Sequence, residues 1–139
     1  MKITKRDKEY ILEFLMQGNS LYDSLEILAN ICENLNLTYL NPRIKHFRYF
    51  QFTFFGFIVK VNGIIDRMIF RADFLKNNIP EFGEVYSTLK KLKNNMEMTY
   101  KSISEKEMVK GKNQIIELYN DYSKIFAGII KICKKLILV

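Results

Sequence analysis

The sequence is poor in residues that make tight turns, because its 139 residues include only six glycines and two prolines. These two residue types supply the backbone conformations that most turns need, so the chain is expected to form a few long elements. Long apolar runs are also missing. The longest, 52–59, has eight residues and includes Thr53 and Gly56, whereas a membrane-spanning helix needs about 20 apolar residues. We therefore expect no transmembrane span.

Signal-peptide and disulfide features are absent as well. The first residues, MKITKRDKEY, have no apolar core of the signal-peptide kind. The two cysteines, Cys32 and Cys133, have no spacing that suggests a metal site or a redox pair. Both fall on the apolar helical stripes described below, so we expect buried free thiols. A reducing, cytoplasmic location fits these features.

Candidate catalytic groups are equally scarce. His46 is the only histidine, which excludes metal sites and hydrolytic triads that use two. The sequence contains no glycine-rich phosphate loop, no zinc-ligand spacing and no Glu-x-x-His signature of di-iron bundles. The neighbouring acids Glu105 and Glu107 are better explained as helix caps. We expect neither an enzyme nor a bound metal or cofactor.

Apolar residues in a helical repeat are what the sequence does contain. The apolar fraction is 48% and the charged fraction 27%, a composition typical of globular chains. Four segments place an apolar residue at every third or fourth position, which predicts one buried stripe on each of four helices. The stripes run from Ile11 to Leu35, from Phe47 to Leu75, from Phe82 to Ile103 and from Met108 to Leu136.

The second stripe allows two interpretations. The segment VKVNGII resembles a β-hairpin with Asn62-Gly63 as its turn, and FQFTF alternates as a strand does. The helical repeat nevertheless continues through Asn62-Gly63 in phase, which a hairpin would have no reason to preserve. We therefore favour one helix, with the hairpin as the alternative. In the first stripe, Gly18 and Asn19 are compatible with a bend.

Capping residues indicate where helices begin. Thr4 followed by Asp7 is a start cap for the first helix. Pro80 suits the first turn of the third. Ser104 with Glu107 has the pattern of a capping box before the fourth.

The connections predicted between the helices are short. They lie near 36–41, 77–79 and 101–104. Short connections make neighbouring helices antiparallel. The sequence therefore predicts a single all-α domain, residues 1–139, folded as an up-down-up-down antiparallel four-helix bundle.

Basic residues stand directly before the second helix. The net charge is +7, and Arg43, Lys45, His46 and Arg48, here called the basic lip, gather where that helix begins. A helix N-terminus favours anions, so each exposed cation there destabilises the helix by on the order of 0.3–1 kcal/mol. A phosphate bound between the cations and the N-terminus would make the interaction favourable instead. We predict that the basic lip binds nucleic acid. An acidic protein surface and a merely solvated basic turn are the alternatives.

Aromatic residues follow the basic lip. Alternating basic and aromatic residues can stack on bases, but Phe47, Phe50, Phe54 and Phe57 follow the buried stripe and are assigned to the core. Other apolar residues of this helix lie off the stripe, and a helix that is apolar on many faces is buried all round. We therefore predict a homo-oligomer. The predicted interface residues are Phe52, Phe55, Gly56, Val59, Gly63 and Phe70.

Several short motifs resemble those of the accessory variability proteins of diversity-generating retroelements. Members of that family are small, basic, four-helix proteins with a Pro-Arg step before the second helix. Here Pro42-Arg43 is that step, and the other basic lip residues follow it. The further matching positions are Lys76-Asn77-Asn78, Ser104, Asp121, Lys124, Ile125, Phe126, Ala127 and Gly128.

The resemblance implies a non-catalytic, ring-forming partner of a reverse transcriptase and its template RNA. The nucleic-acid contacts that it carries over by position are Arg43, Lys45, Arg48 and Lys124. A structural or protein-interaction bundle that binds no nucleic acid is the alternative function. A third hypothesis is a peripheral membrane protein that uses residues 131–139, KICKKLILV, as a basic and apolar tail.

Overall fold

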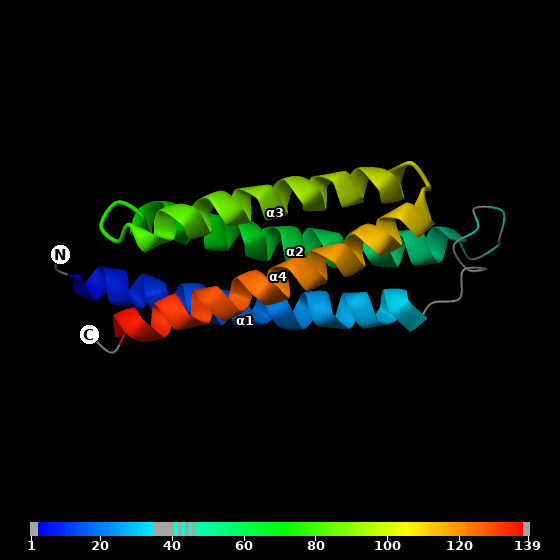
Figure 1. The fold of residues 1–139 in the computed structure, drawn as a ribbon. Helices are drawn as coiled ribbons and strands as arrows, with labels where there is room; N and C mark the ends of the chain where they lie inside the picture. Colours follow the sequence, from blue (N-terminus) through cyan, green and yellow to red (C-terminus); the bar gives the residue numbers. More distant parts are fainter. Residues whose placement is uncertain (1–2, 35–40, 42, 44, 46, 138–139) are drawn as a thin grey trace.

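The fold is a bundle of four antiparallel helices (Figure 1). The computed structural model describes residues 3–34, 41, 43, 45 and 47–137. Each helix packs against the next one along the chain, and α4 also packs against α1. The predicted all-α, up-down-up-down bundle is therefore confirmed. The helices are α1 (Lys5–Asn34), α2 (Phe47–Leu75), α3 (Glu81–Ser104) and α4 (Met108–Ile137).

The predicted apolar stripes form the core between the helices. Leu35 and the side chain of Phe50 lie outside the described residues. On α1, the described apolar positions of the predicted stripe are buried, and so is the thiol of Cys32. Cys133 is buried on α4, and neither cysteine is in a disulfide. The fully buried large side chains include Phe14, Leu21, Leu25, Leu28, Met68, Leu75, Phe82 and Tyr122.

α2 buries a wider strip than its predicted stripe. Ile58, Ile65 and Ala72 are buried beside the predicted positions, whereas Phe57 is half-buried. α2 is the most apolar of the four helices, and a helix with apolar residues on several faces can bury a strip broader than one row of side chains.

The helical interpretation of the second stripe is confirmed. α2 passes through Asn62-Gly63 without a break, and the described residues contain no strand. α1 likewise continues through Gly18 and Asn19 as one helix. Asn62 and Gly63 therefore lie inside a helix. The preference of an Asn-Gly pair for a turn is overridden because the apolar residues before and after the pair are buried only if the helix continues.

The last described residues belong to the bundle. Of the segment considered as a membrane tail, residues 131–137 form the last part of α4, which extends to Ile137, and residues 138–139 lie outside the described residues. Ile132 and Leu136 pack against the core, while Lys131, Lys134 and Lys135 are exposed. Within the described part of the chain, no helix has the length and apolar character needed to cross a membrane.

A hydrogen-bonded cluster fixes the start of α1. The backbone N–H of Thr4 donates to Asp7 Oδ2 at 2.9 Å, and the N–H of Asp7 donates to Thr4 Oγ1 at 3.1 Å, which confirms the predicted cap. Asn78, in the α2–α3 connection, also donates to Asp7 Oδ2 at 2.6 Å. Burial raises the pKa of Asp7, but these hydrogen bonds outweigh it, so the pKa lies below its usual 3.8.

This cluster predicts a difference in acid stability. Because the pKa of Asp7 is lowered on folding, its carboxylate stabilises the fold above about pH 3.8, and this contribution is lost as the pH falls through the folded pKa. Asp7→Asn is expected to lower the free energy of unfolding by about 1 kcal/mol at pH 7. The difference from the parent should shrink at pH 3. Urea denaturation at both pH values measures it. Asp23→Asn, at an exposed position of the same helix, is the control and should change little; equal effects of the two variants would contradict the assignment.

The predicted boundary between the third and fourth helices is wrong. α3 continues to Ser104, so Ser104 cannot cap α4. The chain instead turns at Lys106, whose φ is 65°. The N–H of Lys106 donates to the carbonyl of Ile103 at 3.1 Å, and that of Glu107 to the carbonyl of Ser102 at 2.8 Å. These two bonds form a Schellman motif, which usually has glycine at the left-handed position.

Candidate nucleic-acid interface

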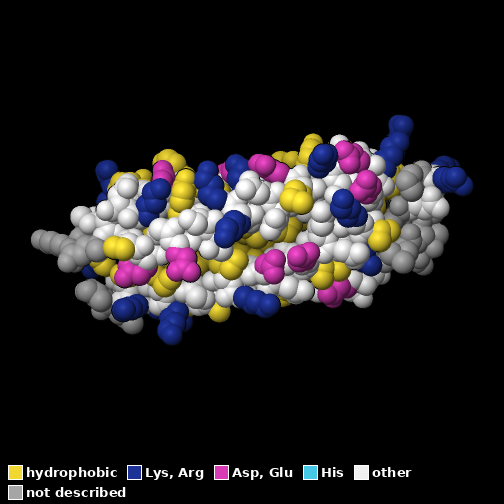
Figure 2. All heavy atoms as spheres, turned by 45° about the horizontal axis from the view of Figure 1, so that its top comes forward, with side chains coloured by type: hydrophobic (Ala, Val, Ile, Leu, Met, Phe, Trp, Pro, Cys, Tyr) yellow, Lys and Arg dark blue, Asp and Glu magenta, His cyan; other side chains and the backbone are white. Residues whose placement is uncertain are grey.

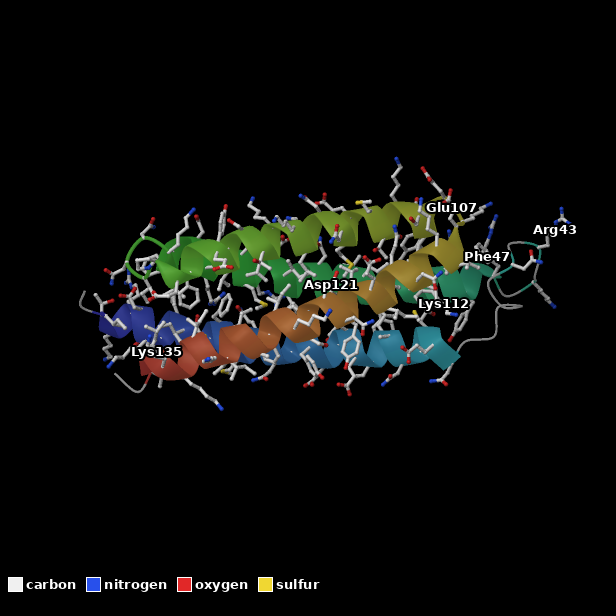
Figure 3. The ribbon with its side chains drawn as sticks, in the orientation of Figure 1. Arg43, Phe47, Glu107, Lys112, Asp121 and Lys135 are labelled. Carbon is white, nitrogen blue, oxygen red and sulfur yellow. The ribbon has the colours of Figure 1, made fainter. Side chains whose placement is uncertain are left out.

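The basic lip lies at the end of the bundle where α1 and α3 finish and α2 and α4 begin. Arg43 and Lys45 precede α2, and Arg48 is the second residue of that helix. All three are exposed, and Arg43 projects beyond the helices (Figure 3). His46 lies outside the described residues. The structure thus keeps the described members of the basic lip together at one end.

Local hydrogen bonds shape the approach to α2. The side-chain carbonyl of Asn41 accepts a hydrogen bond from the N–H of Arg43 at 3.0 Å, the geometry of an Asx turn. One turn into the helix, Gln51 Nε2 donates to the carbonyl of Ile103 at 2.8 Å. This bond ties the start of α2 to the last turn of α3, so the lip is attached to two helices.

The first turn of α2 carries no acidic residue. Arg48 therefore stands beside the positive end of the helix dipole with no acid in that turn to offset it. The first turn of α4, which starts at the same end, also lacks an acid. Oε2 of Glu107, just before α4, lies 3.6 Å from Nζ of Lys110. Both helix N-termini at this end thus add to the positive potential of the side chains.

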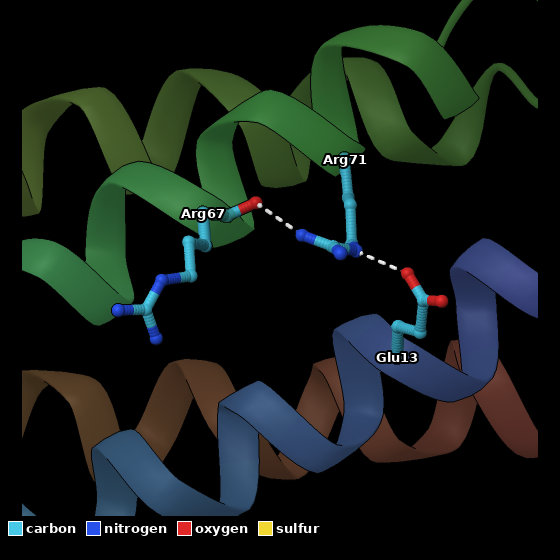
Figure 4. A network of polar contacts seen from close by, with 3 residues as sticks. All are labelled: Glu13, Arg67 and Arg71. Atoms are coloured by element: carbon cyan, nitrogen blue, oxygen red, sulfur yellow. Dashed lines mark hydrogen bonds and ion pairs between the residues drawn. The ribbon is translucent and has the colours of Figure 1, made fainter.

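The ion pairs among the described residues do not include the basic lip. At the far end, Arg71 Nε lies 2.7 Å from Glu13 Oε2, and the same guanidinium donates a hydrogen bond to the carbonyl of Arg67 (Figure 4). Lys76 Nζ lies 3.0 Å from Asp73 Oδ1. In the part of the chain that the structure describes, no such pair involves the basic lip. Acidic and basic side chains are interspersed along the middle of the face shown in Figure 2.

Lys112 adds a further cation near the basic lip. It is half-buried on the first turns of α4 and lies close to Cys32 of α1. Burial raises the pKa of the Cys32 thiol to about 12, and the positive charge of Lys112 opposes that rise. The same end of the bundle therefore holds a further cation, as the up-down-up-down topology predicts, outside the basic lip itself.

Lys124 does not join the basic lip. It lies sixteen residues after the start of α4, which corresponds to about 24 Å along the helix. There it lines a shallow hollow between α3 and α4, together with Lys91, Asn95 and Asp121. The resemblance, and not the residue pattern, gave this position, and any contact it makes with an anion is separate from the lip.

The aromatic residues near the lip divide into core and surface. Phe47 and Phe54 are buried, so they belong to the core as predicted and cannot stack on bases. Tyr49 was not predicted to have a role, yet it follows Arg48 directly and is 70% exposed. An exposed aromatic ring beside cations is the arrangement that stacks on a nucleic-acid base. Its position off the apolar stripe was the signal that could have identified it.

The predicted interface residues lie on the outer side of α2, except for one. Phe52, Val59 and Phe70 are exposed, and the two glycines are open to solvent on one side. Phe55 instead turns towards α3, where its ring lies 5.0 Å from that of Tyr100. Phe55 therefore contributes mainly to the packing within the subunit.

The chain was compared with known proteins. No family model matches it, and neither the curated proteins nor the solved structures contain a match. The fold and the surface described above are therefore the basis for a functional assignment. In the described residues, no group of three or more His, Cys, Asp or Glu side chains could hold a metal ion.

Proposed function

We propose that this protein is a non-catalytic, self-associating four-helix bundle that binds single-stranded nucleic acid through the basic lip. One observation carries the proposal: Arg43, Lys45 and Arg48 are exposed at a helix N-terminus whose first turn contains no acid. Cations at that position are repelled by the positive end of the helix dipole. A phosphate would be attracted both by the cations and by the helix N-terminus. Exposed Tyr49 beside them supplies a stacking surface.

The proposal includes a protein partner. By the resemblance to accessory variability proteins, the chain would assist a reverse transcriptase and contact its template RNA. The motifs from Pro42-Arg43 onwards support this part, and the small size and basic charge of the chain agree with it. A reverse-transcriptase gene beside the gene for this chain is the expected arrangement, and co-purification of the two proteins is the direct test.

The basic lip predicts salt-dependent binding. Each phosphate that the protein neutralises on a single strand contributes roughly 0.7 to the slope of log affinity against log salt. Changing Arg43, Lys45 and Arg48 together to glutamine is therefore expected to flatten that slope by about two units per engaged subunit. Fluorescence anisotropy with labelled single-stranded RNA and DNA, at several salt concentrations, measures the slope. The loss should be similar for different sequences, because phosphate contacts carry no sequence information.

A matched control separates the lip from net charge. Lys131, Lys134 and Lys135 are also three exposed cations, at the opposite end of the bundle. Their change to glutamine removes the same charge and should leave most of the binding intact. Equal losses in both variants would contradict a role of the lip. If the parent binds neither RNA nor DNA at low salt, the nucleic-acid function is wrong and the interaction-module alternative takes its place.

A further inference from the structure

A row of residues on α2 continues the basic lip along the side of the bundle. Its positions alternate by four and three residues, the spacing that keeps side chains on one face of a helix. The row faces the side of α1, because Arg71, one turn beyond its end, reaches Glu13 of that helix (Figure 4). We call it the basic row, and its members are Tyr49, Thr53, Gly56, Lys60, Gly63 and Arg67.

The basic row carries positive charge and no acid. Lys60 and Arg67 are exposed, and among the residues that the structure describes neither is in an ion pair. The two acidic residues of α2, Asp66 and Asp73, lie outside the row, and each already pairs with a lysine. The guanidinium of Arg67 points away from Glu13 (Figure 4). The row therefore offers two cations to an anionic ligand beyond the lip.

A shallow hollow lies along the basic row between the lip and Arg67. It is lined by Thr53, Gly56, Phe57 and Lys60, and its volume is about 220 Å³. Tyr49, one turn before Thr53, is exposed. Single-stranded nucleic acid is typically bound where cations hold the backbone and aromatic side chains stack on the bases. Tyr49 and the hollow supply the stacking surfaces, and Lys60 supplies the charge beside them.

The length of the basic row selects an extended ligand. Arg48 of the lip and Arg67 are nineteen residues apart on α2, or about 28 Å along the helix axis. A single phosphate or a compact anion cannot contact both, whereas an extended strand places phosphates along the whole distance. Sites for single strands commonly cover about 4–16 nucleotides. The row ends where an acid, Glu13, lies 2.7 Å from Nε of Arg71.

We infer that a single strand of nucleic acid continues from the basic lip along the basic row, with bases on Tyr49 and in the hollow and with phosphates at Lys60 and Arg67. The inference rests on the nucleic-acid binding in the proposed function and deepens it, because it extends a contact at one end of the bundle into a path along its side. The large exposed apolar residues of α2 lie in the neighbouring row and remain available for self-association; they are Phe52, Val59 and Phe70.

A salt titration tests the basic row. Lys60→Gln combined with Arg67→Gln removes two phosphate contacts, so the slope of log affinity against log salt should flatten by roughly 1.4 units. Fluorescence anisotropy with a labelled single strand of about 12 uridines measures the slope. Lys60→Arg combined with Arg67→Lys keeps both charges and should keep the slope of the parent. Lys134→Gln combined with Lys135→Gln removes the same charge from exposed positions of α4 and should change the slope little.

Photo-cross-linking locates the strand. When 4-thiouridine replaces uridine in the same strand, near-ultraviolet light should attach it to Tyr49 or Phe57, as identified by mass spectrometry of the peptides. Cross-links confined to residues outside α2 would overturn the basic row and leave the proposed function standing. The same holds if the row variant keeps the slope of the parent while the basic lip variant still loses affinity. A parent that does not bind the strand at low salt would overturn both.

Discussion

Phe14→Ala is expected to lower the free energy of unfolding by about 3–5 kcal/mol. Phe14 is fully buried on α1, and its ring meets that of Phe82, at the start of α3, edge to face at a centroid distance of 5.4 Å. The variant loses the transfer free energy of the ring and leaves a cavity between helices that are not neighbours along the chain. The loss is a large part of the 5–15 kcal/mol that stabilises a typical domain.

Guanidinium denaturation followed by circular dichroism measures this loss. Leu12→Ala is the control, because Leu12 lies on the same helix but is 49% exposed, and such surface changes usually stay within about 0.5 kcal/mol. A loss below about 1 kcal/mol for Phe14→Ala would mean that the ring does not fill the core as the structure places it.

Gly18→Ala has the second largest expected effect, a loss of about 1–3 kcal/mol from overpacking. The added methyl group would lie 2.8 Å from Cε1 of Phe126 and 3.3 Å from the hydroxyl of Tyr122. These two rings are stacked at 5.5 Å, and Tyr122 donates a hydrogen bond to the carbonyl of Gly18 at 3.0 Å. The close approach of α1 and α4 at this point therefore leaves no room for a side chain.

The same substitution in open space serves as the control. A Cβ at Gly128 meets nothing within 4 Å, so Gly128→Ala should stabilise the fold by about 0.5–1 kcal/mol through helix propensity alone. Phe126→Leu should make room at Gly18, so the double variant Gly18→Ala with Phe126→Leu should be more stable than the sum of the single losses predicts. If Gly18→Ala were stabilising to the same degree as Gly128→Ala, the packing assigned to Gly18 would be wrong.

Helical periodicity made most of the fold predictable. In α1 and α3 a single row of apolar residues identified the buried side. In α2 the same rule missed Ile58, Ile65 and Ala72, and in α4 the predicted row passed through Ile125, which is half-buried, whereas its neighbour Phe126 is buried. Which of several adjacent apolar residues is buried depends on where the neighbouring helices lie, and this is not visible in one segment.

The ends of the helices and the details of the site were harder to predict. The boundary after α3 was misplaced because Lys106 adopts a left-handed conformation that a sequence pattern would assign to glycine. The cations of the basic lip were found from their position before an apolar stripe. Tyr49 was overlooked although its position off the apolar stripe signals exposure, and residue spacing along α4 already places Lys124 far from the lip. The contact of Phe55 with Tyr100 of α3, in contrast, depends on how helices are placed side by side, which the local pattern does not contain.

The antiparallel order of the helices also decides how the protein can be attached to a surface. α1 starts and α4 finishes at one end of the bundle, and the basic lip lies at the other (Figures 1 and 3). The length of α2, 29 residues, separates the two ends by about 43 Å. A tag, a fluorophore or a linker joined to either terminus therefore stands several Debye lengths away from Arg43, Lys45 and Arg48 at physiological salt. Immobilised through a terminus, the molecule presents the lip outwards, and the tether adds little to the electrostatics that a ligand experiences there.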